Sequence, residues 1–153
     1  MSFRNPIVSL HRTTRLRLNH GRSARLGDVP SSAAALHAWW ITTGIAQDAA
    51  LAPVLLYLHG QRWNLSGHTE RIARQCQLGF AILAIDYQGF GRSTAALPSE
   101  SSVVEDAHAA WKWLLPQIEP ARPVYIYGHS LGSAIAVQLA ADPEMNTFLL
   151  RNS

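Results

Sequence analysis

Ser130 lies in the segment of this sequence whose residue types and spacing best suit covalent chemistry. The segment Gly-His-Ser-Leu-Gly, residues 128–132, separates the apolar run PVYIY from an alanine-rich run that ends before Asp142-Pro143. A serine between a strand and a helix can project its hydroxyl above the sheet, because the flanking glycines remove side chains that would collide with nearby backbone. Free N–H groups at the helix start can stabilise an oxyanion. The segment predicts a nucleophilic serine, and the simpler alternative is a helix N-cap serine in another kind of α/β protein.

Two further groups stand at the ends of apolar runs. PVLLYL is followed by His59-Gly60, and FAILAI is followed by Asp86. Apolar runs of this length that end at glycine or a polar residue are typical of strands buried on both faces of a parallel sheet. Chemistry in such sheets gathers at the carboxyl ends of the strands. We therefore expect His59, Asp86 and Ser130 to lie at one edge of one sheet.

Strands and helices alternate along most of the chain, which predicts an α/β fold with three layers, α/β/α, around a mostly parallel sheet. The predicted strands cover residues 9–18, 35–44, 53–60, 80–89 and 123–128, and the predicted helices cover residues 66–79, 101–118 and 130–141. Ser102 and Glu105 fit a capping box at the start of the second helix. Ile72, Cys76 and Leu78 fit a buried stripe on the first.

Three motifs stand in an order that is found in a known superfamily. They are LYLHGQ after the third strand, DYQGFGRS after the fourth and GHSLGS after the fifth. With these motifs the chain resembles the α/β-hydrolase superfamily, and it is most similar to the monoacylglycerol-lipase-like and serine-aminopeptidase-like members. The resemblance is best over residues 53–143. It implies one α/β-hydrolase domain over residues 1–153, truncated after the fifth strand and its helix and so incomplete at the C-terminus.

The resemblance implies a role in catalysis for three residues. Ser130 corresponds to the nucleophile that attacks an ester, thioester or amide carbonyl and forms an acyl-enzyme. The backbone N–H groups of Gln61 and Leu131 correspond to the oxyanion hole.

Six more residues would support the site: His59, Gly60, Asp86, Gly128, His129 and Gly132. In the family, His59 supports the oxyanion turn and His129 fills the variable position of the nucleophile turn. Neither histidine is expected to take the serine proton, and Asp86 is expected to anchor the turn that follows its strand.

The catalytic acid and base that the resemblance implies are absent from this sequence. In this fold they follow the serine in the order acid, then histidine. No histidine follows Ser130, and Asp142 falls at the far end of the helix that begins beneath it. We therefore expect a truncated hydrolase that is inactive alone, with turnover no higher than that of a Ser130→Ala variant. The bare edge of VYIY is expected to pair with another strand or to self-associate.

A non-catalytic interaction module on a half α/β-hydrolase fold is the alternative function. A nucleotide-binding domain is disfavoured, because GFGRST lacks the third glycine of a dinucleotide fingerprint. Trp63, Phe90 and Leu131 near the strand ends indicate an apolar, lipid-like acyl substrate. We predict no cofactor and no bound metal. His37, His68 and His108 are interpreted as residues on helix or strand faces.

Composition sets the remaining expectations. Only 15% of the 153 residues are charged and 48% are apolar, which is typical of a globular domain. The net charge is +3, but the arginines near the N-terminus alternate with Leu16 and Leu18, so nucleic acid is not an expected partner. Cys76 is the single cysteine, so no intramolecular disulfide can form. No segment is apolar for long enough to be a signal peptide or a membrane span, and we expect a cytoplasmic protein.

Overall fold

A computed structural model of the chain describes residues 9–17, 35–42 and 51–145. The strands are β1 (Ser9–Arg17), β2 (Ala35–Thr42), β3 (Val54–Leu58), β4 (Ala81–Ile85) and β5 (Val124–Gly128). The α-helices are α1 (Thr69–Gln77), α2 (Glu100–Leu114) and α3 (Leu131–Ala140), and two short 3₁₀ helices are η1 (Leu65–His68) and η2 (Leu115–Gln117). Each predicted strand and helix is present, with ends that differ by a few residues. The segments 18–34, 43–50 and 146–153, which include predicted loops and the tail TFLLRNS, lie outside the described residues.

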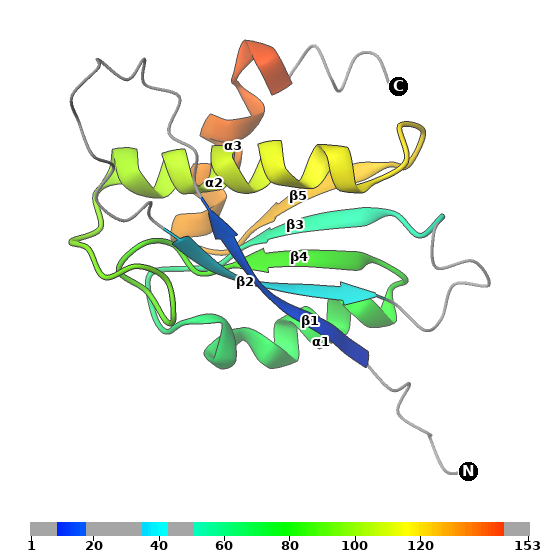
Figure 1. The fold of residues 1–153 in the computed structure, drawn as a ribbon, viewed down its shortest axis with the longest axis horizontal. Helices are drawn as coiled ribbons and strands as arrows, with labels where there is room; N and C mark the ends of the chain where they lie inside the picture. Colours follow the sequence, from blue (N-terminus) through cyan, green and yellow to red (C-terminus); the bar gives the residue numbers. More distant parts are fainter. Residues whose placement is uncertain (1–8, 18–34, 43–50, 146–153) are drawn as a thin grey trace.

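The five strands form one mixed sheet in the order β1-β2-β4-β3-β5 (Figure 1). The pairs β1·β2 and β2·β4 are antiparallel, whereas β3 is parallel to both β4 and β5. Four of the five strands therefore run in the same direction and only β2 is reversed, which confirms the prediction of a mostly parallel sheet. Consecutive parallel strands require helical crossovers, and α1 and α2 supply them.

Helices cover both faces of the sheet and give the predicted three layers. Figure 1 shows α2 and α3 on one face and α1 on the other. The side chains of β3 alternate between two buried clusters, because successive residues of a strand point to opposite faces. Leu56 and Leu58 pack with α2 and α3, whereas Leu55 and Tyr57 pack with Ile72 of α1. All five residues of β3 and of β4 are buried, which explains their continuous apolar runs.

The start of α2 differs from the prediction. Ser99 is the N-cap, and the capping box joins Ser99 to Ser102. The Ser99 hydroxyl accepts a hydrogen bond from the Ser102 N–H at 3.1 Å, and the Ser102 hydroxyl accepts one from the Ser99 N–H at 2.9 Å. The predicted pair of Ser102 and Glu105 was therefore wrong by one turn, because a serine takes the place of the usual glutamate at the third helical position.

Leu78 is also placed differently from the prediction, since 72% of its surface is exposed. It follows the last residue of α1, and Gly79 then turns the chain with φ +96°. Ile72 and Cys76 are buried as predicted. No helix among the described residues has the length and apolar character needed to cross a membrane.

β5 forms one edge of the sheet as the structure describes it. Within the described residues it pairs only with β3, from Val124↔Val54 to Gly128↔Leu58. Tyr125 in the middle of β5 is 53% exposed. The predicted bare edge is therefore present among these residues.

Candidate active site

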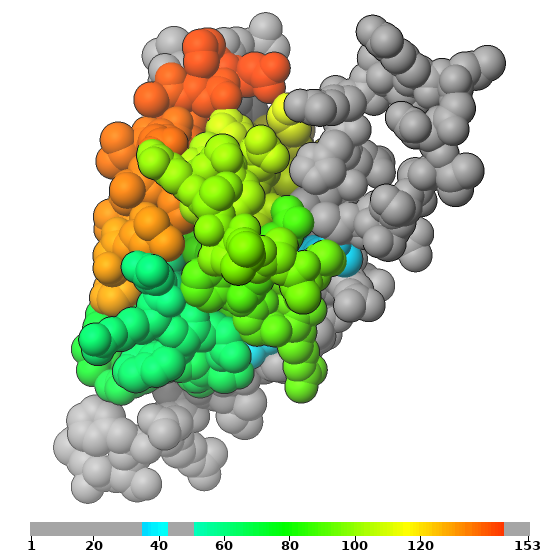
Figure 2. Space-filling model, turned by 90° about the vertical axis from the view of Figure 1, so that its left-hand side faces the viewer, coloured from blue at the N-terminus to red at the C-terminus, as the bar shows by residue number. Residues whose placement is uncertain are grey.

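The carboxyl ends of β3, β4 and β5 lie at one end of the molecule, and each is followed by one of the predicted motifs. Figure 2 looks onto this end, where the segment after β3 (teal), the segment before α2 (lime green) and α3 (orange) lie side by side. Gln61, Phe90 and Leu131, one from each segment, line a common pocket. The structure therefore brings together the three groups that the sequence placed at strand ends.

Ser130 forms the turn between β5 and α3. Its backbone has φ 55° and ψ −117°, and α3 begins at the next residue, Leu131. A positive φ is strained for a residue with a side chain, and such strain persists only where the surroundings fix it. Here the Gly132 N–H donates to the His129 carbonyl at 3.0 Å, and the Ser133 N–H donates to the Ser130 carbonyl at 2.9 Å. The Ser130 side chain is left exposed on the turn.

The two glycines of this turn are needed because backbone passes very close to them. A Cβ on Gly132 would lie 2.0 Å from the carbonyl oxygen of Leu58 at the end of β3. A Cβ on Gly128 would lie 2.1 Å from the carbonyl oxygen of Gly132 itself. Without side chains here, the start of α3 packs directly against the ends of β5 and β3.

The loop after β3 lies against the Ser130 turn. A Cβ on Gly60 would come within 3.2 Å of the Ser130 Cβ and within 3.1 Å of the His129 carbonyl oxygen. The His129 N–H donates to the Leu58 carbonyl at 3.0 Å, which fixes the two segments together. Among the described residues, no acceptor is found for the N–H of Gln61 or of Leu131. Both predicted oxyanion donors are therefore free of protein acceptors in this part of the chain.

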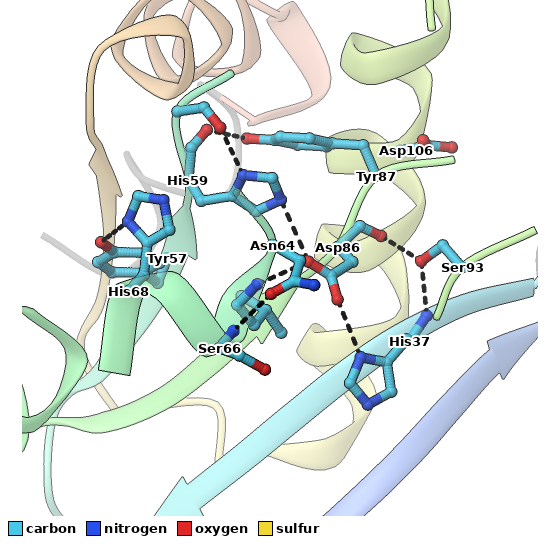
Figure 3. Close-up of polar contacts among 12 residues, drawn as sticks. His37, Tyr57, His59, Asn64, Ser66, His68, Asp86, Tyr87, Ser93 and Asp106 are labelled. Carbon is cyan, nitrogen blue, oxygen red and sulfur yellow. Dashed lines mark hydrogen bonds and ion pairs between the residues drawn. The ribbon is translucent and has the colours of Figure 1, made fainter. Parts of the chain in front are cut away.

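Asp86 joins the loop after β3, the segment after β4 and strand β2 (Figure 3). Its Oδ1 accepts a hydrogen bond from the Leu65 N–H at 2.9 Å, and its Oδ2 lies 3.0 Å from His37 Nδ1. The Asp86 carbonyl accepts a bond from the Ser93 hydroxyl, whose oxygen in turn accepts one from the His37 N–H. Asp86 is 2% exposed. Its predicted anchoring of the turn after β4 agrees with these contacts, which also extend to the loop after β3.

His59 connects Asp86 to the loop that carries Gln61. Its Nδ1 donates to the Gly60 carbonyl at 2.7 Å, and its Nε2 lies 3.4 Å from Asp86 Oδ1. The His59 carbonyl accepts a hydrogen bond from the Tyr87 hydroxyl at 3.0 Å. The His59 ring thus orients the Gly60–Gln61 peptide, and it is fully buried.

His37 was interpreted from sequence only as a residue on a strand face, and the structure gives it this contact with Asp86. The two residues are 49 positions apart and meet because β2 pairs with β4 in the register Ala38↔Ile85. No local pattern in the sequence signals this pair, because the register of two distant strands creates it.

His68 is another residue that the sequence did not single out. Its Nε2 donates to the Arg62 carbonyl at 3.2 Å, so its Nδ1 accepts from the Tyr57 hydroxyl at 3.1 Å. Burial lowers the pKa of His68 and raises the pKa of Tyr57 to about 12. His68 is therefore neutral near pH 7, and it holds the loop after β3 in place through Arg62.

We expect Asp86 to make the fold sensitive to acid. Burial alone raises the pKa of Asp86, but the contacts with His59 and His37 and the Leu65 N–H outweigh it and hold the pKa below its ordinary value. The unfolded chain then binds the proton first, so the free energy of unfolding falls as pH drops below about 4. At pH 7, Asp86→Asn should be about 1–3 kcal/mol less stable than the unchanged protein. Its free energy of unfolding should fall less than that of the unchanged protein as the pH drops below about 4.

Urea unfolding at a series of pH values measures this difference. Asp142→Asn is the matched control, because Asp142 is partly exposed and lies 3.5 Å from His108 in a weaker pair. If Asp86→Asn and the unchanged protein lose the same stability in acid, Asp86 is not the group responsible.

Two pockets meet at Gln61, on either side of the Ser130 turn. One, of ≈ 280 Å³, is largely apolar, and its lining includes Phe90, Val103, Leu131 and Ile135. The other, of ≈ 290 Å³, is lined mainly by polar and charged residues, including Ser130, His129, Arg62 and Arg71, and is called the polar pocket below. Phe90 and Leu131 share the apolar pocket as expected, whereas Trp63 lies with the polar one.

No base for Ser130 is found among the described residues. No hydrogen bond joins the Ser130 hydroxyl to another side chain in this part of the chain, and His129 turns its Nδ1 towards Gly60. Asp142 follows the C-terminus of α3, which has 10 residues and is therefore about 15 Å long. Asp142 therefore lies a helix length away from the Ser130 turn, as the sequence predicted.

Comparison with known proteins identifies relatives of the chain. Residues 50–149 match the family described as serine aminopeptidase, S33. The chain is 38% identical over 89 residues to lysophosphatidylserine lipase ABHD12 of Danio rerio, which covers 57% of this chain and 23% of that protein. It is 36% identical over 102 residues to the uncharacterized protein Rv2307c of Mycobacterium tuberculosis, which covers 65% of this chain and 36% of that protein. The chain thus spans about a quarter to a third of the length of these relatives.

Solved structures share the fold. The Pyrococcus furiosus esterase Pf2001 superposes with a TM-score of 0.60 at 23% identity, over 74% of this chain and 44% of that one. An alpha-beta hydrolase from Vibrio vulnificus gives a TM-score of 0.60 at 26% identity, over 77% of this chain and 39% of that one. With the family matched over residues 50–149 and the fold shared with these structures, the chain belongs to the serine aminopeptidase S33 family of the α/β-hydrolase superfamily.

Proposed function

We propose that the protein is a serine hydrolase of carboxylic esters, with thioesters and amides as related substrates, and that Ser130 is its nucleophile. The observation that carries the proposal is the strained backbone of Ser130 at the start of α3, with an exposed side chain. A strand-to-helix turn of this geometry presents a hydroxyl above the sheet and beside free helix N–H groups. An N-cap serine explains the position less well, because the Ser130 side chain makes no capping hydrogen bond.

The proposed reaction follows from these positions. The Ser130 oxygen attacks the substrate carbonyl as a base removes its proton, and the negative charge that develops on the carbonyl oxygen is stabilised by the N–H groups of Gln61 and Leu131. The leaving alcohol departs with a proton, which leaves an acyl group on Ser130. Water then attacks the acyl-enzyme and releases the carboxylic acid. Asp86 and His59 would act as positioning residues, since they hold the peptide that carries the Gln61 N–H.

We propose that the acid and the histidine base belong to the whole protein outside these 153 residues. The support is that no histidine follows Ser130, while the matched segments make up only 23% and 36% of the two relatives. The 153-residue chain alone should then turn over p-nitrophenyl butyrate no faster than its Ser130→Ala variant. Ser130-dependent turnover by the purified 153-residue chain would contradict this assignment.

An apolar acyl group is the proposed substrate feature. The apolar pocket beside Leu131 and Phe90 supports it, because such side chains bind hydrocarbon by removing it from water. The relatives named lysophosphatidylserine lipase also support a lipid-like ester. Rates with p-nitrophenyl acetate, butyrate and octanoate test this feature in the protein as its native cell makes it, and kcat/KM should rise with chain length. A rate that falls steadily from acetate to octanoate would contradict it.

A second candidate is a non-catalytic interaction module, which the edge of β5 supports, since among the described residues it pairs with β3 alone. An edge strand presents free N–H and C=O groups to which another chain can add a strand. The intact mass of the protein in its native cell separates the two candidates. A mass near 16.8 kDa together with a partner bound at β5 favours the module, and a larger mass with Ser130-dependent turnover favours the hydrolase.

A further inference from the structure

The polar pocket beside Ser130 carries positive charge without an acidic residue to neutralise it. Its lining residues are Gly60, Gln61, Arg62, Trp63, Gly67, His68, Arg71, His129 and Ser130. Two of them are arginines, which stay charged at every physiological pH. None is an aspartate or glutamate. Both arginines therefore line the same concave surface as the proposed nucleophile.

The arginines of this pocket have no carboxylate partner among the described residues. The acid next in sequence to Arg71 is Glu70, but its Oε1 accepts a hydrogen bond from Arg74 at 2.7 Å. That pair occupies the exposed face of α1 and leaves Arg71 unpaired. No ion pair is found for Arg62 either within the part of the chain that the structure describes.

His129 adds a polar group to the same pocket. Its Nδ1 is buried against Gly60 and has no hydrogen-bond partner, whereas its Nε2 is not buried. With no acceptor at Nδ1, the ring proton is favoured on Nε2, where it can be donated into the pocket. The neighbouring His68 has both nitrogens engaged by Tyr57 and Arg62, so it keeps its ring fixed, 5.6 Å from that of His129.

We propose that Arg62 and Arg71 form a binding subsite for an anionic group, a phosphate or a carboxylate, carried by the substrate on the leaving-group side of the ester. Guanidinium groups bind such oxygens through paired, charge-assisted hydrogen bonds. Ser130 and Gln61 line the same pocket, and Gln61 also lines the apolar pocket, so an ester at Ser130 reaches both. The inference rests on the proposed hydrolase function and specifies its substrate: an apolar acyl chain joined to an acidic head group.

Binding of glycerol 3-phosphate to the 153-residue chain tests the anion site without any catalysis. Calorimetric titration at low ionic strength should detect glycerol 3-phosphate and should detect no binding of glycerol, its neutral counterpart. Arg62→Gln and Arg71→Gln should each weaken the affinity about tenfold, and the double variant should weaken it further. Arg74→Gln is the matched control, because it removes an arginine of the same helix that is paired with Glu70 outside the pocket. Equal weakening by Arg74→Gln would overturn the site, since that result indicates general surface charge.

Ester kinetics test whether the anion belongs to the substrate. In the protein as its native cell makes it, kcat/KM should be higher for a monoacylglycerol 3-phosphate than for the monoacylglycerol with the same acyl chain. The double variant should remove this preference, mainly through a higher KM for the phosphorylated ester, so that the two esters are hydrolysed with similar kcat/KM. A preference that survives in the double variant overturns the substrate role, and equally tight binding of inorganic phosphate would then assign the pocket to free phosphate.

The binding titration and the ester kinetics together also separate this inference from the proposed function. If no ester is hydrolysed through Ser130, the hydrolase proposal and the substrate role of the pocket both fail, and the titration alone decides whether an anion site exists. If esters are hydrolysed without regard to charge, the hydrolase proposal stands and the inference is rejected.

Discussion

Replacing Ser130 with alanine is expected to abolish ester hydrolysis by the protein as its native cell produces it. Loss of the nucleophile from a serine hydrolase lowers kcat by about 10⁶-fold, because no other group can form the acyl-enzyme. The expected rate is therefore close to the background in buffer. Release of p-nitrophenol from p-nitrophenyl butyrate measures this loss. Mass spectrometry should find a fluorophosphonate adduct on the peptide that contains Ser130 in the unchanged protein only.

Ser101→Ala serves as the control for this experiment. Ser101 is an exposed serine on α2, and its substitution leaves the Ser130 turn untouched. Turnover retained by Ser130→Ala would show that another group is the nucleophile. Absence of turnover and of an adduct in the unchanged native protein would instead reject the hydrolase and leave the interaction module.

Replacing Gly132 with alanine is expected to destabilise the fold by about 3 kcal/mol, a large part of the total stability of a small domain. The added Cβ would lie 2.0 Å from the Leu58 carbonyl oxygen and 2.9 Å from that of His59. Both oxygens belong to backbone at the end of β3, which is buried on both faces and cannot move aside without disrupting the sheet. Urea unfolding, monitored by circular dichroism, measures the change.

Gly79→Ala provides a comparison that separates steric overlap from backbone strain. Gly79 has φ +96°, but a Cβ there would meet nothing within 4 Å. Its substitution should cost about 1 kcal/mol, because only the unfavourable φ opposes it. If Gly132→Ala costs no more than Gly79→Ala, α3 does not pack as closely on β3 as the structure indicates.

The elements that carry the site could be predicted because their sequence signals are local. β3 and β4 are buried on both faces, so each gives an unbroken apolar run that ends at a polar motif. The turn at Ser130 could be located because glycines on both sides of the serine leave room for close backbone contacts. The predicted capping box of Ser102 and Glu105 was wrong because Ser102, at the third helical position after Ser99, takes the role that a glutamate usually has.

Contacts between distant segments could not be predicted from the same signals. His37 reaches Asp86 only through the antiparallel register of β2 with β4. Arg62 and Arg71 come to share a pocket because the loop after β3 folds back through η1 and α1. In sequence both look like ordinary solvated arginines. The i, i+4 spacing of Glu70 and Arg74 predicts their ion pair on α1, but it does not show that Arg62 and Arg71 line one pocket.

The position of Gln61 affects how substitutions can change the substrate choice of this site. Its main chain supplies a proposed oxyanion donor, and the residue lines both pockets. Mutation at this codon can therefore reshape substrate choice while the backbone donor remains, because every amino acid except proline keeps the N–H. Selectivity and rate acceleration are then separable traits, and relatives can acquire new substrates without first rebuilding the catalytic machinery.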